Sequence, residues 1–155
     1  MKLYRIARAD RATTALAAFS GDGAAKYPGR WNRKGVRAVY CSDTLAGACL
    51  ETLVHLRPLP RVFPPSVYYE VEINDALLEK PDLLALPASW NAAVVTNETR
   101  DFGTQFLTST RAVGLLIPTA VIPLGWSVVV NPCHRKFPID DVKGPIPFYY
   151  DPRLE

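Results

Sequence analysis

Short stretches of alternating or continuous hydrophobic residues along this chain predict its strands. Residues 67–73 read VYYEVEI, in which β-branched and aromatic residues alternate with glutamates as in a half-buried strand. The nearly continuous apolar run AVGLLIPTAVI at 112–122 predicts a buried strand interrupted at Pro118. The remaining strands are expected at residues 2–7, 36–41, 127–131 and, at an edge, 145–150.

Three stretches predict helices, at residues 11–19, 44 to about 56, and 98–110. Ser42 or Asp43 can cap the second helix, and the Arg57-Pro58 step and Pro60 end it. Residues 21–35, GDGAAKYPGRWNRKG, contain four glycines and four basic residues and predict a long loop. Together these elements predict an α+β fold with about six strands, built as a single domain over residues 1–155.

The composition fits one globular domain and changes this picture little. Apolar residues make up 48% and charged residues 21%, and the net charge of +3 is too small to indicate nucleic-acid binding. We expect no membrane span, and the N-terminus lacks the apolar run of a secretory signal. The three cysteines form no CxxC pair, which predicts buried thiols without disulfides in a reduced cytoplasm.

The predicted helix at residues 44–56, TLAGACLETLVHL, carries a single acidic residue, Glu51. Apolar residues cover nearly all of its sides, which predicts a buried helix. A carboxylate there is costly unless it is paired or faces a cavity. Glu51 is therefore either a functional carboxylate or the partner of His55 or an arginine in a structural pair. The ExxxH spacing does not favour zinc.

The glycine-rich loop offers a candidate anion contact in Arg30, between Gly29 and Trp31. An arginine in a tight turn suits bidentate recognition of phosphate or carboxylate, whereas Arg33 and Lys34 are expected in solvent. Tyr40 ends the strand that leads into the Glu51 helix, so its ring either lines the same cleft or belongs to the core. The sequence contains no GxSxG, Walker or GxGxxG motif.

Five motifs follow one another along the chain: YPGRWN (27–32), GVRAVY (35–40), LETLVHL (50–56), IPTAV (117–121) and NPCH (131–134). Together with the FYYDPRL tail at residues 148–154, they cover nearly the whole chain. In this order they resemble the RES domain, the toxin half of bacterial RES–Xre toxin–antitoxin modules. The resemblance implies a fold similar to ADP-ribosyltransferase toxins, with a split β-sheet around a cleft for NAD.

The resemblance also implies an activity and a set of site residues. Family members degrade NAD by hydrolysis or phosphorolysis, or transfer its ADP-ribose to a protein. Glu51, Arg30 and Tyr40 correspond to the catalytic residues: Glu51 stabilises positive charge on ribose, Arg30 holds the pyrophosphate and Tyr40 stacks on nicotinamide. Further substrate contacts are expected from Tyr27, Thr119 and Ser127.

Two positions depart from the family pattern. Thr119 replaces the family serine and is expected to bond the nicotinamide ribose or amide, and Ser127 stands where the family often has asparagine. The resemblance implies NAD as substrate without a metal, and an Xre-type antitoxin as partner. A protein target of ADP-ribosylation is another possible partner, and no direct nucleic-acid or membrane binding is expected. The alternative is a catalytically weak module that binds an ADP-ribose-like ligand or a partner protein.

Overall fold

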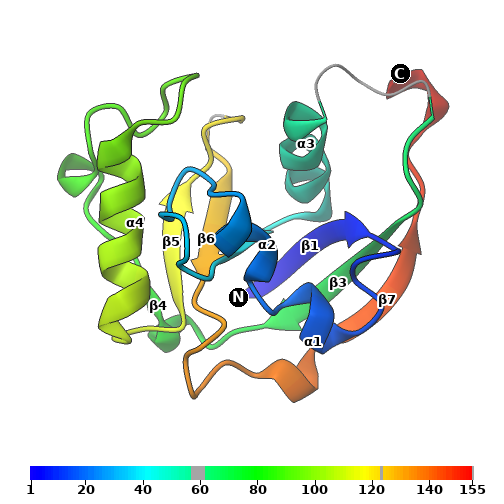
Figure 1. The fold of residues 1–155 in the computed structure, drawn as a ribbon, viewed down its shortest axis with the longest axis horizontal. Coiled ribbons are helices and arrows are strands. Elements are labelled where there is room, and N and C mark those ends of the chain that lie inside the picture. Colours follow the sequence, from blue (N-terminus) through cyan, green and yellow to red (C-terminus); the bar gives the residue numbers. More distant parts are fainter. Residues whose placement is uncertain (57–61, 123, 155) are drawn as a thin grey trace.

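Seven strands form one sheet in the computed structural model of the protein, which describes residues 1–56, 62–122 and 124–154 (Figure 1). The strand order is β4-β5-β6-β2-β1-β3-β7, so the predicted edge strand near the C-terminus is confirmed as β7. The strands are β1 Lys2–Arg8, β2 Val39–Ser42, β3 Ser66–Glu72, β4 Leu78–Glu79, β5 Gly114–Pro118, β6 Trp126–Val130 and β7 Lys143–Phe148. The short β4 was not predicted, because two residues carry no periodic pattern.

The sheet is divided between β1 and β2. These two strands share a single residue pair, Tyr4 with Ser42, whereas β1 and β3 pair along all seven residues of β1. Strands β4, β5, β6 and β2 therefore form one half of the sheet, and β1, β3 and β7 form the other (Figure 1). The predicted α+β domain with a split sheet is confirmed.

The first half of the sheet is covered by helix α4, Asn97–Ser109. Phe106 and Leu107 of α4 are buried in a cluster with Trp31 and Leu115. Gly103 lies against the backbone carbonyl of Trp31, and a Cβ atom there would collide with it. The glycine that weakens the helical pattern is thus required by a close approach between helix and loop.

Helix α3, Leu45–His55, confirms the most informative helix of the sequence, although its cap is Thr44 rather than Ser42 or Asp43. The Thr44 Oγ1 atom accepts a hydrogen bond from the Gly47 N–H at 3.0 Å. The prediction that α3 is buried on all sides is wrong, because Leu50 and Val54 are 39% and 46% exposed. Arg57, Pro58 and Pro60, expected to end the helix, lie outside the described residues.

Two further differences concern the first third of the chain. The helix expected at 11–19 is reduced to α1, Ala15–Ala18, and the expected loop at 21–35 contains a helix, α2, Asp22–Lys26. Gly21, with a φ of 73°, caps α2, and Gly23 lies within it. Because glycines are typical of loops, the sequence pattern does not predict this short helix. Along the chain, α2 is followed by the Arg30 loop and then by β2.

Within the described residues, no helix is long and apolar enough to cross a membrane. The cysteine prediction is correct only for Cys41, which is buried; Cys49 is half-buried and Cys133 is exposed.

Candidate active site

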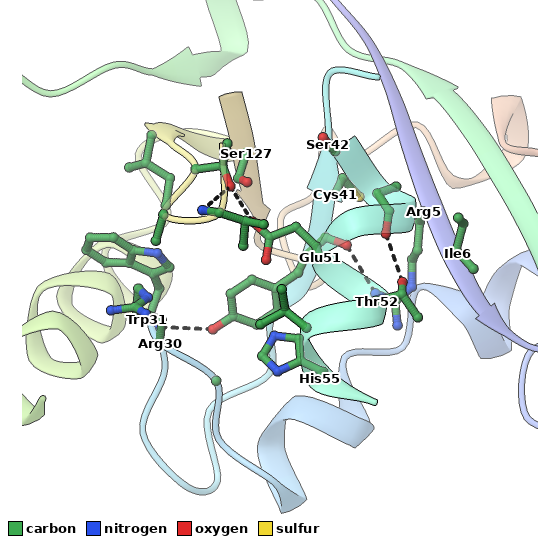
Figure 2. Close-up of a pocket in the computed structure, with 18 of the residues that line it drawn as sticks. Arg5, Ile6, Arg30, Trp31, Cys41, Ser42, Glu51, Thr52, His55 and Ser127 are labelled. Carbon is green, nitrogen blue, oxygen red and sulfur yellow. Dashed lines mark hydrogen bonds between the residues drawn. The ribbon is translucent and has the colours of Figure 1, made fainter. Parts of the chain in front are cut away.

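A cavity of about 530 Å³ opens where the two halves of the sheet separate. Its walls come from β1, β2, α3, the ends of β5 and β6, and the loop before Trp31 (Figure 2). This volume falls within the usual range for small-molecule sites. Five of the six predicted site residues line it: Arg30, Tyr40, Glu51, Thr119 and Ser127.

Glu51 lies half-buried on α3 and faces this cavity (Figure 2). Its carboxylate accepts a hydrogen bond from the Thr119 hydroxyl. Among the residues that the structure describes, no ion pair joins Glu51 to His55 or to an arginine, although His55 also lines the cavity. The charge of Glu51 is therefore held in place by a neutral hydroxyl and left available to a ligand.

Thr119 directly follows β5 and is 8% exposed. Its Oγ1 atom accepts the Val121 N–H at 3.1 Å and donates its only proton to Glu51. A Cβ atom on Gly125 would lie 2.7 Å from the Thr119 methyl group, so the bare glycine makes room for threonine. The geometry joins Thr119 to the carboxylate rather than leaving its proton for a ligand.

Arg30 reaches the cavity from the loop that follows α2. Its Nη1 atom donates to the Trp90 carbonyl at 3.0 Å, which orients the guanidinium without neutralising it. Partial burial lowers the pKa of Arg30, and the nearby charge of Glu51 opposes that shift. Gly29 is essential to this turn, because a Cβ atom there would lie 2.6 Å from the Tyr40 hydroxyl oxygen.

Asn32 organises this loop and was missed as a functional residue in the sequence analysis. It is fully buried, and its Oδ1 atom accepts the Gly29 N–H at 2.9 Å and the Tyr40 O–H at 2.7 Å. Its amide group donates to the carbonyls of Ala24, Arg33 and Val36 at 2.8–3.2 Å. An asparagine inside a glycine-rich basic segment was the available signal.

Tyr40 combines both roles considered from the sequence. Its ring lines the cavity, while its hydroxyl donates to Asn32 and accepts the Trp31 N–H at 3.0 Å. Burial raises the pKa of Tyr40 well above its ordinary value, so the phenol stays neutral. The hydroxyl is thus committed to the loop, and only the ring is available to a ligand.

One predicted contact, Tyr27, lies apart from this arrangement. Tyr27 is 67% exposed and absent from the cavity wall, because it follows α2 and its ring turns outward beneath the Lys26 ammonium group, 5.3 Å away. Arg33 is not simply solvated, since it forms a two-pronged ion pair with Asp101 of α4. Ser127 lines the cavity from β6, paired with Ser42 of β2.

The described residues contain no group of three or more histidine, cysteine or acidic residues that could hold a metal ion.

Comparison with known proteins gives matches over most or all of the chain. The chain is 35% identical over 161 residues to a Yersinia enterocolitica protein named Toxin Res, covering 100% of both chains. It is 34% identical over 142 residues to the Prs ADP-ribosylating toxin of a Sphingobium species, covering 87% of this chain and 85% of that protein.

Among solved structures, the fold is similar to one in the crystal structure of the M. tuberculosis MbcT–MbcA toxin–antitoxin complex. The TM-score is 0.68 at 20% identity, over 99% of this chain and 85% of the other. The profile of the RES domain itself matches residues 2–151, so all seven strands of the sheet and the whole cavity fall inside one match. The protein belongs to the RES domain family.

Proposed function

We propose that this protein is the toxin of a toxin–antitoxin module and that it cleaves the nicotinamide–ribose bond of NAD. The observation that carries this proposal is Glu51, a carboxylate held by Thr119 in a cavity and free of ion pairs among the described residues. The names of the relatives, Toxin Res and Prs ADP-ribosylating toxin, support the biological role and the chemical class.

The chemistry of the bond explains why a fixed carboxylate suits this task. As nicotinamide leaves, positive charge develops on C1′ and the ring oxygen of the ribose in an oxocarbenium-like transition state. A carboxylate that is already oriented stabilises that charge without first reorganising. In this proposal Thr119 orients Glu51, and the ring of Tyr40 stacks on the nicotinamide.

Arg30 supplies the complementary charge for the rest of the substrate. Its guanidinium carries a fixed positive charge, and the Trp90 carbonyl engages only one of its donors. Guanidinium groups bind phosphate oxygens through paired hydrogen bonds, so Arg30 would hold the pyrophosphate. Ser127 lines the same cavity from β6 and offers a hydroxyl for a ribose hydroxyl.

The reaction is completed when a nucleophile bonds to C1′ of the nicotinamide ribose and loses its proton. The C1′–N bond breaks, its electron pair goes to nicotinamide, and nicotinamide leaves as a neutral molecule. Water, inorganic phosphate and a protein side chain each satisfy this balance. They yield ADP-ribose, a phosphorylated ADP-ribose and an ADP-ribosylated protein, respectively. The three products differ in mass, which makes the acceptor measurable.

The proposal is tested by incubating the pure protein with NAD and measuring free nicotinamide by chromatography. Parallel samples contain buffer alone, added phosphate, or cell lysate, and mass spectrometry identifies the ADP-ribose product. Release in any sample supports cleavage and names the acceptor. If nicotinamide stays absent in all three while ADP-ribose still binds, the protein is a binding module and the enzymatic proposal fails.

An antitoxin partner follows from the same proposal, because a protein that consumes NAD would harm its own cell. The solved structure with a similar fold is that of a toxin–antitoxin complex, which supports such a partner. We expect an Xre-type antitoxin with an acidic segment that enters the cavity near Arg30. Expression alone should arrest growth, and co-expression with the neighbouring gene should restore it. Normal growth of cells containing the folded protein alone would refute this role.

A further inference from the structure

The tail at residues 148–154 carries a motif that the proposed mechanism does not use. Its two tyrosines follow each other in the chain but have very different surroundings. Tyr149 is 85% exposed. The ring of Tyr150 stacks on the ring of Phe63, with 4.4 Å between their centroids, and meets Phe148 edge-on at 5.0 Å. Tyr150 therefore fastens the tail to the rest of the domain.

The hydroxyl group of Tyr150 is buried and has no hydrogen-bond partner among the described residues. Its surroundings are nevertheless polar. Burial raises the pKa of Tyr150, and the neighbouring hydroxyls of Ser66 and Thr52 oppose that shift. The Tyr150 hydroxyl therefore lies next to a hydroxyl of β3 and a hydroxyl of α3.

Two other contacts fix the direction of any hydrogen bond at this place. The Thr52 hydroxyl donates to the Ala48 carbonyl at 2.8 Å, and the Ser66 hydroxyl donates to the Pro64 carbonyl at 2.9 Å. Each of these hydroxyls has one proton, so toward Tyr150 their oxygens can only accept. Tyr150 is therefore the donor, and a bond from it to Thr52 would tie the tail to α3.

Packing alone accounts for the ring of Tyr150 but not for its hydroxyl. A phenylalanine would make the same aromatic contacts with Phe63 and Phe148. A buried hydroxyl without a well-formed hydrogen bond lowers stability, because it has given up its bonds to water. Departures from the most stable choice are expected where a residue serves a functional site.

Thr52 connects this place to the cavity. It directly follows Glu51 on α3, and both residues line the cavity (Figure 2). Helix α3 packs on β1 and β2, but its outer side is open at Leu50 and Val54. A small movement of the second half of α3 would change the distance between the Glu51 carboxylate and the Thr119 hydroxyl.

We infer that Tyr150 is a positioning residue, which holds the second half of α3 through Thr52 and thereby keeps Glu51 in contact with Thr119. The inference rests on the proposed function for the task of Glu51, but the contact of the tail with α3 does not depend on turnover. It gives the C-terminal motif a part in the reaction without any contact with the substrate.

The test compares Tyr150→Phe with Tyr149→Phe, the matched control at the exposed neighbour. Tyr150→Phe keeps the ring and removes only the hydroxyl, so the melting temperature should stay the same or rise. Measured well below that temperature, kcat for nicotinamide release should nevertheless fall about 5-fold, with KM for NAD unchanged. Tyr149→Phe should match the wild type in all three quantities. A folded Tyr150→Phe variant with wild-type kcat would overturn the inference.

A double-mutant cycle shows whether Tyr150 acts through Glu51. Adding Tyr150→Phe to Thr119→Val should lower kcat by less than about 2-fold, because the contact that Tyr150 maintains is already absent. If Tyr150→Phe lowers kcat as much in Thr119→Val as it does in the wild type, the two residues act independently and the inference fails.

Hydrogen exchange followed by NMR tests the support of α3 without turnover. In Tyr150→Phe, the amides of residues 51–55 should exchange about 5-fold faster than in the wild type, while those of α4 keep their rates. Unchanged rates at residues 51–55 would overturn the inference. If Tyr150→Phe does not fold, Thr52→Val, which removes the acceptor instead of the donor, takes its place in all three measurements. A wild-type protein that releases no nicotinamide would refute the proposed function, and the exchange rates would then decide the contact with α3.

Discussion

Two segments that bring charged groups to the cavity, the loop of Arg30 and the helix of Glu51, are supported in opposite ways. The loop is held from within by a fully buried asparagine, whose side chain joins five groups from Ala24 to Tyr40. Helix α3 has an exposed apolar side, and the carboxylate of Glu51 is held by one hydroxyl, that of Thr119, which directly follows β5. Arg30 is thus placed by local order, and Glu51 by a contact across the cavity.

This difference separates stability from catalysis. Removing a group that supports the loop should disturb folding first, because buried donors and acceptors lose their partners. Removing a group on the α3 side should disturb activity first, because few other contacts depend on it.

The largest effect is expected for Asn32→Ala. The change leaves the Gly29 N–H, the Tyr40 hydroxyl and three carbonyls without their buried partner, so the free energy of unfolding should fall by about 3 kcal/mol or more. Urea denaturation measures this loss. The control, Asn97→Ala, removes an exposed contact to Arg33 and should cost less than about 1 kcal/mol. Equal losses in the two variants would contradict the role of Asn32.

Glu51→Gln should leave the protein folded and lower its turnover of NAD. The amide keeps the shape and accepts the Thr119 proton but removes the negative charge, so kcat should fall by about 10²-fold or more at a nearly unchanged melting temperature. Nicotinamide release measures kcat, and the exposed Glu72→Gln is the matched control. Wild-type turnover in a folded Glu51→Gln protein would remove Glu51 from the mechanism, and simple unfolding would make it structural.

Arg30→Ala is the corresponding change on the loop and should act on substrate binding. Because the guanidinium contacts the substrate before and during reaction, KM for NAD should rise by about 10-fold or more. Initial rates over a range of NAD concentrations give KM and kcat separately. A variant that loses only kcat, with KM unchanged, would assign Arg30 to the transition state alone.

Thr119→Val should give a smaller effect that tests the contact across the cavity. Valine has the shape of threonine without the hydroxyl, so Glu51 loses its orienting bond, the Val121 N–H loses its acceptor, and kcat should fall about 10-fold. Thr119→Ser keeps the hydroxyl and should remain close to wild type. Thr108→Val, at an exposed threonine of α4, is the control. If valine and serine reduced kcat equally, the hydroxyl would not be the important group.

The smallest effect is expected for Asp101→Asn, which breaks the ion pair that ties Arg33 to α4. Both groups are largely exposed, so at pH 7 the melting temperature should fall by no more than about 2 °C. Arg33 lowers the pKa of Asp101, so the contribution is present above the ordinary aspartate pKa and is lost as the pH falls through the lowered value. The difference in melting temperature between variant and wild type should therefore shrink as the pH is lowered from 7 to 3. A difference of the same size at both pH values would assign the effect to something other than charge.

Local patterns made much of the fold predictable. Strand β3 and helix α3 were found because alternation and capping act over neighbouring residues. Helix α2 was missed because glycines obscure its short pattern. The exposure of Leu50 and Val54 was missed because the apolar character of a residue does not show whether another element covers it.

The candidate site was predictable only in part, and the RES resemblance supplied most of it. It named Arg30 and Glu51, and both line one cavity in the structure. The bond between Thr119 and Glu51 joins residues 68 positions apart, which no spacing could indicate. Arg5, which also lines the cavity from β1, gave no signal in the sequence. A single arginine in an alternating strand is expected to face outward, and only the structure shows its hydrogen bonds to the Ala18 and Tyr40 carbonyls.

The contact between the Thr119 methyl group and Gly125 limits the order in which this protein can change over evolution. With threonine at position 119, any side chain at 125 meets that methyl group, with Cβ only 2.7 Å from it. Loss of the methyl group, by a change to serine, must therefore precede any gain of a side chain at 125. The reverse order passes through an intermediate in which Thr119, the residue that holds Glu51, is displaced. Selection on activity therefore favours the change at 119 before the change at 125.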